Sequence, residues 1–161
     1  MDNSYKQKFW WENLEKDIQE LLNESFLLLN LFEEEPGKFS DFSFIVFPAA
    51  KAYEGFLKKL FLDKGFISED DYYGKRFRIG KALNPYLEKE IRNESVYDKI
   101  VAHCGGTTLA DLFWETWTSC RNRVFHWFPN EKKIVTLPEA GDKLEMIVKA
   151  IDEAYKACNT E

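Results

Sequence analysis

The strongest constraint on the fold is a row of apolar or small side chains that recurs every three or four residues. Its first stretch runs from Trp11 to Phe32 and occupies positions 11, 14, 18, 21, 25, 28 and 32. This alternating spacing places a single apolar stripe along one face of a long α-helix. We therefore expect a helix over 11–32.

Three further stripes of the same kind predict three further helices, over 45–64, 108–128 and 136–158. Their ends carry ordinary boundary signals. Gly65 follows the second helix, Pro129 follows the third, and Thr136 with Glu139 forms the capping-box pattern that starts the fourth. Between the first and second helices, Pro36 predicts a loop.

Amphipathic helices can bury their stripes only against one another, so the sequence predicts an all-α fold. Four such helices in a chain of 161 residues favour a four-helix bundle that forms a single domain over 1–161. Residues 66–107, between the second and third helices, are less regular. Within them, Asn84 as an N-cap and Pro85 at the first helical position predict a short inserted helix over 84–94.

The charges are unevenly distributed along the chain. The net charge of −6 argues against indiscriminate binding to nucleic acid, which needs a surplus of Lys and Arg. Residues 1–71 carry a net −7 and residues 134–161 a net −3, whereas residues 72–133 carry a net +4. A basic middle segment therefore lies between acidic flanks.

The sequence gives little support for membrane insertion or metal chemistry. No apolar stretch approaches the ~18 residues needed to cross a bilayer, and the N-terminus lacks the apolar core of a signal peptide. We therefore expect a cytoplasmic protein with no membrane partner. Three widely spaced cysteines, Cys104, Cys120 and Cys158, predict reduced and largely buried thiols. Two histidines exclude a multi-histidine metal centre, although not a carboxylate-rich one, and we expect neither a metal nor another cofactor.

Polar residues interrupt the apolar pattern of the third helix near its end, in the segment SCRNRVFHWFP (119–129). Arg121 lies one helical turn after Trp117 on the core-facing side, and His126 follows five residues later. An ideal helix separates this pair by roughly 140° around its axis. The two side chains can converge only where the helix frays near its end or where a second subunit completes the site.

The string RNRVFH resembles the Arg-x(4–6)-His motif of the HEPN superfamily of helical nucleotide-binding domains, including the polar residue, here Asn122, directly after the arginine. In that superfamily the motif also lies at the end of the third bundle helix. Many members are metal-independent RNases of toxin–antitoxin, CRISPR-associated and phage-defence systems, and they typically form two-fold dimers in which two motifs face each other. The resemblance therefore implies an endoribonuclease, a homodimer and, in a toxin–antitoxin system, an antitoxin protein as partner.

A narrower similarity is to the HEPN toxin domain of RNase LS-type toxins, in which an acidic residue on the second helix accompanies the arginine and the histidine. The segment AAKAYEGFLKKLF (49–61) resembles that helix and places Glu54 in this role. Glu54 could equally pair with Lys58, one helical turn away. Both interpretations remain open on the sequence.

The chemistry implied by the resemblance is RNA cleavage by attack of the ribose 2′-hydroxyl on the adjacent phosphorus, which leaves a cyclic phosphate. His126 would act as general acid or base, and Arg121 would stabilise the charge that develops on the phosphorane. Asn122 would bind the phosphate or orient the imidazole, and Glu54 would position Arg121 or His126. DNA would be spared because it lacks the 2′-hydroxyl.

A run of cations and aromatic rings, YYGKRFRIGK (72–81), is typical of surfaces that bind single-stranded nucleic acid, where bases stack and phosphates pair. We predict RNA contacts by a set of cations that includes one within the motif itself: Lys75, Arg76, Arg78, Lys81 and Arg123. The alternative is a solvated loop whose aromatic side chains cover the bundle.

Two other functions remain open. One is a non-catalytic HEPN module that binds a nucleotide or RNA with the same residues but transfers no proton. The other is a helical protein that binds a partner, such as a nucleotidyltransferase-like antitoxin, through its acidic first helix. The surroundings of Arg121 discriminate among these functions, because an arginine deep in the core against an acidic side chain could hold no phosphate.

Overall fold

The computed structural model describes residues 3–35, 37–127, 129 and 134–158. Every regular element in these ranges is helical, so the all-α prediction is confirmed. The predicted break at Pro36 lies outside the described residues. Within the same ranges, no helix is both long and apolar enough to span a bilayer.

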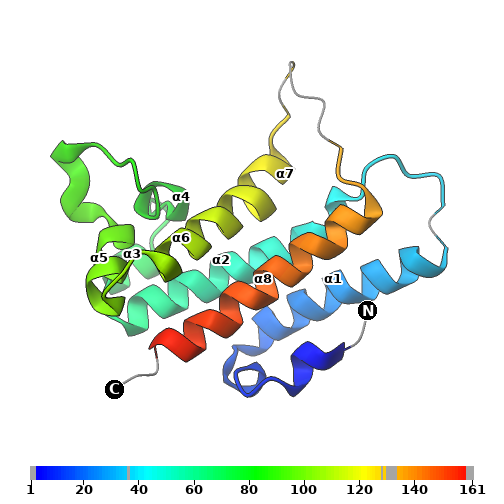
Figure 1. Ribbon diagram of the computed structural model, residues 1–161, viewed down its shortest axis with the longest axis horizontal. Helices are drawn as coiled ribbons and strands as arrows, with labels where there is room; N and C mark the ends of the chain where they lie inside the picture. The colour runs from blue at the N-terminus through cyan, green and yellow to red at the C-terminus, as the bar shows by residue number, and fades with distance from the viewer. Residues whose placement is uncertain (1–2, 36, 128, 130–133, 159–161) are drawn as a thin grey trace.

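Four rods of helix carry the core. Three of them are long helices that lie side by side (Figure 1): α1 (Lys16–Glu34), α2 (Ser43–Asp63) and α8 (Leu137–Cys158). The fourth rod is built from three consecutive segments: α6 (Thr108–Trp117), the π-turn η4 (Thr118–Asn122) and α7 (Arg123–Phe125). α1 packs against α2 and α8, and both of these pack against the fourth rod. The apolar stripes meet in one core, whose largest fully buried members include Leu22, Leu29, Ile45, Tyr53, Leu57, Phe61, Phe113, Leu144 and Ile147.

The boundary signals predicted for α2 and α8 are confirmed. Gly65 follows the end of α2 with a φ of +67°, a conformation that favours glycine. At the start of α8, the Thr136 backbone N–H donates to the Glu139 carboxylate at 2.8 Å, and the Glu139 N–H donates to the Thr136 hydroxyl at 3.4 Å. This capping box lowers the pKa of the Glu139 carboxyl, because the hydrogen bond from the Thr136 backbone stabilises the charged form.

A proline interrupts α2 where the helix packs against α1. Pro48 has no N–H to donate, so it weakens the hydrogen-bond ladder of its own helix. The next residue, Ala49, donates its backbone N–H to the hydroxyl of Ser25 on α1 at 2.8 Å. Ser25 is fully buried, so this bond joins the two helices inside the core.

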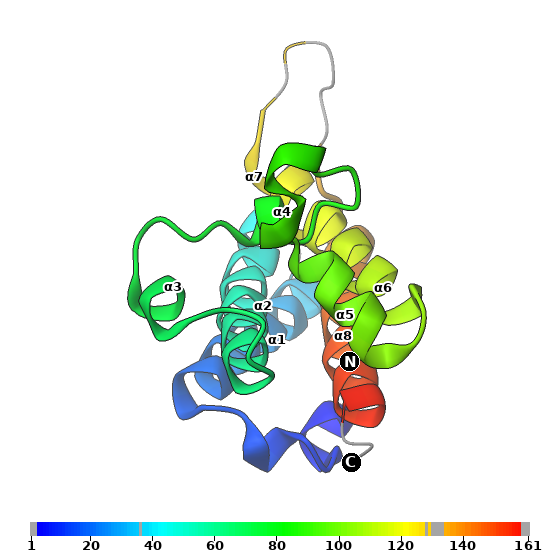
Figure 2. The ribbon, with the colours of Figure 1, turned by 90° about the vertical axis from the view of Figure 1, so that its left-hand side faces the viewer.

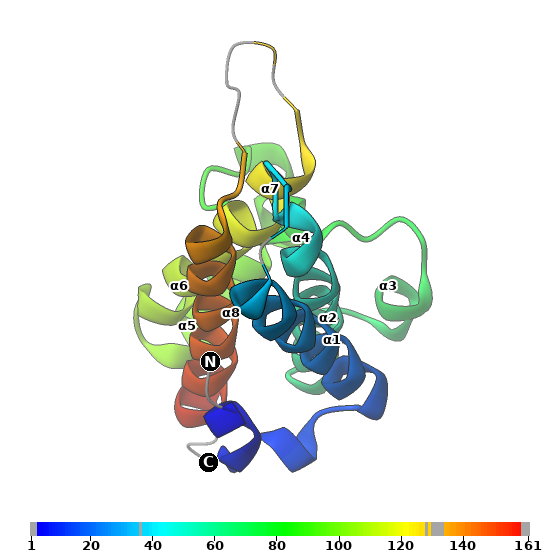
Figure 3. The same cartoon turned by 90° about the vertical axis from the view of Figure 1, so that its right-hand side faces the viewer.

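The predicted start of the first helix at Trp11 is wrong, because α1 begins at Lys16. A separate 3₁₀ turn, η2 (Trp11–Asn13), precedes it, and Leu14 is extended. The Gln19 side chain donates to the carbonyls of Trp11 and Leu14 at 2.8 and 3.2 Å and so fixes the bend. The bend lets the preceding chain, with the 3₁₀ turn η1 (Asn3–Gln7), lie near the end of α8 (Figure 3).

The insertion between α2 and α6 gathers at the end of the molecule where α2 finishes and α6 starts (Figures 1 and 2). It contains four short elements: α3 (Glu69–Tyr73), α4 (Ile79–Ala82), η3 (Lys89–Glu94) and α5 (Val96–Cys104). The predicted helix over 84–94 is wrong, since only its second half is helical, as a 3₁₀ turn. Asn84 does not cap a helix, because its side-chain oxygen accepts the N–H of Tyr86 at 2.9 Å in a local turn.

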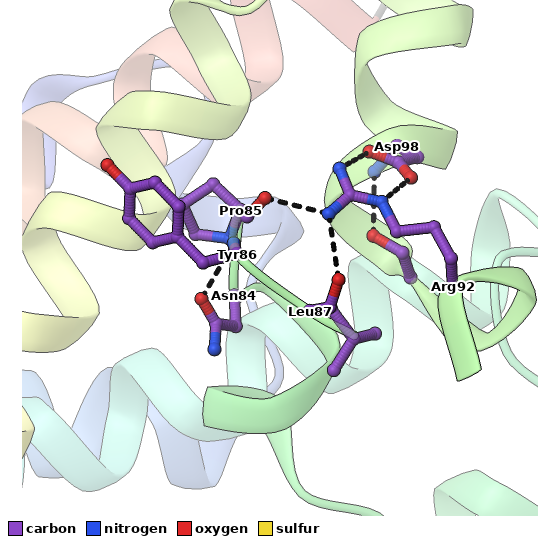
Figure 4. Close-up of polar contacts among 7 residues, drawn as sticks. Asn84, Pro85, Tyr86, Leu87, Arg92 and Asp98 are labelled. Carbon is purple, nitrogen blue, oxygen red and sulfur yellow. Dashed lines mark hydrogen bonds and ion pairs between the residues drawn. The ribbon is translucent and has the colours of Figure 1, made fainter. Parts of the chain in front are cut away.

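Arg92 holds the middle of the insertion together (Figure 4). Its Nε and Nη2 atoms donate to the Asp98 carboxylate at 2.5 and 2.6 Å. Its Nη1 atom donates to the carbonyls of Pro85 and Leu87 at 2.7 and 3.3 Å. One guanidinium therefore ties the irregular segment at residues 85–87 to the first turn of α5. The segment itself lacks the regular backbone hydrogen bonds of a helix.

Candidate functional site

The candidate motif lies where the fourth rod loses its regular α-helical form. The rod was predicted as one helix over 108–128, and this is wrong in two places. A π-turn replaces the α-helix over 118–122, and α7 ends at Phe125, whereas Phe128 lies outside the described residues. Arg121 and Asn122 occupy the last two positions of the π-turn. Such turns are rare in helices and occur frequently at functional sites.

Arg121 lies against an aromatic ring at the surface of the core. Its guanidinium carbon is 5.2 Å from the ring centroid of Trp117, within the range of a cation–π contact. Arg121 is half-buried, whereas Trp117 is buried. Among the described residues, no carboxylate forms an ion pair with Arg121. The guanidinium of Arg121 therefore does not form an ion pair in the core, and its N–H donors are left to bind an anion.

His126 directly follows the last residue of α7. Its backbone is extended, with φ of −110° and ψ of 130°, and its side chain is exposed. The helix thus ends before His126, which removes the rotation that an ideal helix would impose on the Arg121–His126 pair. Phe125 packs this end of the rod against α2, because its ring lies edge-on to that of Phe47 with the two ring centroids 5.1 Å apart.

Glu54 and Asn122 are both half-buried. Among the described residues, neither side chain forms a hydrogen bond or an ion pair that would support its predicted role. Glu54 lies two helical turns after Phe47 and therefore on the same face of α2, which faces α7. Among the described residues, Glu54 forms an ion pair neither with Arg121 nor with Lys58. Neither interpretation of Glu54 is therefore supported by an ion pair in the part of the chain that the structure describes.

The cations of the basic run gather around α4. Lys75, Arg76 and Arg78 are exposed, and Lys81 forms an ion pair with Glu94 at 2.7 Å. Gly80, on the same helix α4, lies close to the candidate motif. A Cβ atom built on Gly80 would lie only 2.8 Å from the indole nitrogen of Trp117, the residue on which Arg121 stacks.

Two lysines that sequence reasoning missed stand near the predicted cations. Lys99 on α5 lines a hollow together with Arg76 and Arg78. Lys143 on α8 lines a second hollow beside Arg123 and donates its Nζ to the Ser119 carbonyl at 3.0 Å. Neither lysine is near the predicted cations in sequence, and only the packing of α5 and α8 brings them there.

The cysteines differ from one another in their surroundings. Cys120 is buried, its thiol donates to the Lys143 carbonyl at 3.5 Å, and burial raises its pKa to about 12. This thiol is therefore protonated at neutral pH and a poor nucleophile. Cys104 is only half-buried, which corrects the expectation of largely buried thiols, and the side chain of Cys158 lies outside the described residues. In the part of the chain that the structure describes, no three His, Cys, Asp or Glu side chains gather as metal ligands.

Comparison of the chain with models of protein families, with curated proteins and with solved structures gave no match.

Proposed function

We propose that this chain is a metal-independent endoribonuclease of the HEPN type, with a four-helix-bundle domain and a cytoplasmic toxin–antitoxin or phage-defence role. The observation that carries the proposal is the placement of Arg121 on a π-turn at the end of the fourth rod, stacked on Trp117, with His126 exposed just beyond the helix end. An arginine used only for packing would be expected to pair with a carboxylate at the edge of the core. Arg121 has no such pair among the described residues.

In the proposed reaction, the ribose 2′-oxygen attacks phosphorus, the bond to the 5′-oxygen breaks, and a cyclic phosphate and a 5′-hydroxyl end are formed. Arg121 donates to the non-bridging oxygens as negative charge develops on them. His126 exchanges a proton with the attacking or the leaving oxygen, as an imidazole can near neutral pH. Asn122, next to Arg121 on the π-turn, supplies a further donor for the phosphate.

A homodimer would complete this site. The end of the molecule that carries His126 exposes large apolar side chains, since Phe47 is 56%, Trp127 75% and Ile134 55% exposed. Large apolar side chains grouped on a surface favour burial against a protein partner. A two-fold dimer through this surface would bring two copies of Arg121 and His126 together.

The decisive experiment is cleavage of mixed single-stranded RNA by the purified protein in the presence of EDTA, with cyclic-phosphate ends assayed. Arg121→Ala and His126→Ala are made in parallel, with Lys38→Ala, at an exposed position in the loop after α1, as the matched control. We expect the two motif variants to lose at least about 100-fold in rate, as is typical when a group that stabilises charge or transfers a proton is removed, and the control to keep full activity. Sedimentation of each variant checks the dimer.

A non-catalytic RNA-binding module is the second candidate, because binding needs only Arg121 and the exposed cations of the basic run, Lys75, Arg76 and Arg78. A wild-type protein that sediments as a folded dimer but cleaves no RNA would exclude the nuclease. If it then binds 2′-O-methyl RNA and Arg121→Ala does not, the binding module is the correct function.

A further inference from the structure

A separate pocket lies within the insertion. Its lining comes only from residues 66–99, and its volume is about 460 Å³, within the usual range for small-molecule sites. Cations and aromatic rings from four parts of the insertion meet in it: Phe66, Arg76, Phe77, Arg78, Lys81 and Lys99. We call this hollow the insertion pocket.

The charge of the insertion pocket is positive although the protein as a whole is acidic. Four cations line it against two carboxylates, Asp71 and Glu94, and both carboxylates already have partners. Asp71 accepts the N–H and the hydroxyl of Ser68 at 3.2 and 2.8 Å in the capping box of α3. Glu94 is paired with Lys81 at 2.7 Å. The remaining positive charge is therefore uncompensated within the pocket.

The two arginines retain donors for an anion. Arg78 uses Nη1 to hold its own loop, donating to the carbonyls of Lys75 and Phe77 at 2.6 and 3.2 Å, which leaves Nε and Nη2 available. Among the described residues, Arg76 has neither a hydrogen bond nor an ion pair. A guanidinium fork matches two oxygens of a phosphate, and two such groups with an ammonium nearby favour a phosphomonoester dianion.

The aromatic side chains indicate what is attached to that phosphate. Phe66 and Phe77 are half-buried and line the same hollow as the cations. Rings beside cations are the arrangement that binds a base and its phosphate in single-stranded nucleic acids. We propose that the insertion pocket binds a nucleoside 5′-monophosphate, either as a free nucleotide or as the 5′-phosphorylated end of an RNA strand.

Short α4 links this pocket to the candidate motif. Lys81 and Ala82 line the pocket, while Gly80 lies against Trp117, which carries Arg121 on its ring. A strand that starts in the pocket would thus lead across α4 toward the motif. The proposal itself depends only on residues of the insertion, so it can fail or succeed independently of the proposed cleavage.

Calorimetric titration with AMP, adenosine and inorganic phosphate tests the pocket. We expect AMP to bind more tightly than either fragment, and Arg76→Ala to weaken AMP binding by about ten-fold or more, as the loss of a charge-assisted hydrogen bond does. Lys89→Ala is the matched control, because Lys89 is exposed on η3 and outside the pocket, and it should leave AMP binding unchanged. Glu94→Gln should have the opposite effect and tighten binding, since it frees Lys81 from its carboxylate partner.

The source of the phosphate is tested with short 2′-O-methyl oligonucleotides that carry either a 5′-phosphate or a 5′-hydroxyl. Tighter binding of the phosphorylated strand than of AMP identifies an RNA end as the ligand, whereas stronger binding of AMP identifies a free nucleotide. The proposal is wrong if AMP does not bind, or binds no better than inorganic phosphate, to a protein whose circular dichroism is that of the folded chain. Equal AMP binding by folded Arg76→Ala and wild type would also overturn it.

Discussion

Gly80 is a position at which the insertion lies very close to the fourth rod. A methyl group there would meet the indole nitrogen of Trp117 at 2.8 Å, closer than real Cβ contacts allow. Moving Trp117 aside would cost free energy, because its side chain is packed in the core with only 4% exposed and contacts the Arg121 guanidinium. The absence of a side chain at residue 80 therefore sets how α4 and the candidate motif fit together.

We predict that Gly80→Ala destabilises the protein by about 1–2 kcal/mol, because overpacking outweighs the better helix propensity of alanine. The free energy of unfolding in urea measures this effect. Gly106→Ala is the matched control, since a Cβ atom there meets nothing within 4 Å, and its stability should stay within about 0.5 kcal/mol of wild type. A Gly80→Ala protein as stable as wild type would show that the close approach of α4 to Trp117 is not required.

Among the helices, those with continuous stripes were predictable and those held by side chains were not. α2 and α8 follow the three-four spacing and end at ordinary signals, namely Gly65 and the Thr136–Glu139 capping box. The bend before α1 depends on one side chain, Gln19, which binds two carbonyls. The spacing of apolar residues cannot reveal such a hydrogen bond, so the start of α1 was predicted at Trp11 and not at Lys16.

The candidate site was predictable only in its residues, not in its geometry. The order Arg121, Asn122, His126 was visible in the sequence, but a π-turn adds a residue to a helix without changing which residue types occur. Lys99 was missed for a different reason. α5 was not predicted, so nothing in the sequence placed its side chain in the pocket formed by residues up to 33 positions earlier.

The hydrogen bonds of Arg92 to Asp98, Pro85 and Leu87 hold the insertion in shape, so their removal should loosen the insertion alone. We predict that Arg92→Met, which keeps the apolar stem but removes all donors, speeds amide hydrogen exchange over residues 85–98. Exchange in α1 and α8 should not change, because the hydrogen bonds that the structure describes for Arg92 are all to residues of the insertion. Lys89→Ala, on the exposed surface of the same segment, serves as control. Exchange that rises equally in α1 and α8 would mean that the insertion is not a separate unit of stability.

At the scale of the whole molecule, one carboxylate joins the first and last segments of the described chain. Asp152 on α8 is 8% exposed and accepts the indole N–H of the fully buried Trp10 at 2.8 Å. Lys156 and Lys8 approach the same carboxylate at 2.9 and 3.5 Å. Burial on its own raises the pKa of Asp152, but the hydrogen bonds from Lys156 and Trp10 and the charge of Lys8 outweigh it, so the pKa is lowered.

This lowered pKa predicts how stability depends on pH. A carboxyl group whose pKa is lower in the folded state stabilises that state fully above its ordinary value of 3.8 and loses the contribution as the pH falls through the lowered value. Asp152→Asn keeps an acceptor for Trp10 but removes the charge, so at pH 7 it should cost about 1 kcal/mol, because both lysines are partly exposed.

The difference in unfolding free energy between wild type and Asp152→Asn should therefore stay constant from about pH 7 to pH 5 and shrink toward zero below about pH 4. Urea titrations across this range measure it, with Asp142→Asn as the control, since Asp142 is an exposed aspartate on the same helix. The control should differ little from wild type at any pH. A difference for Asp152→Asn that persists undiminished at the lowest pH would mean that the variant acts through packing. The negative charge would then not be what holds residues 8–10 against α8.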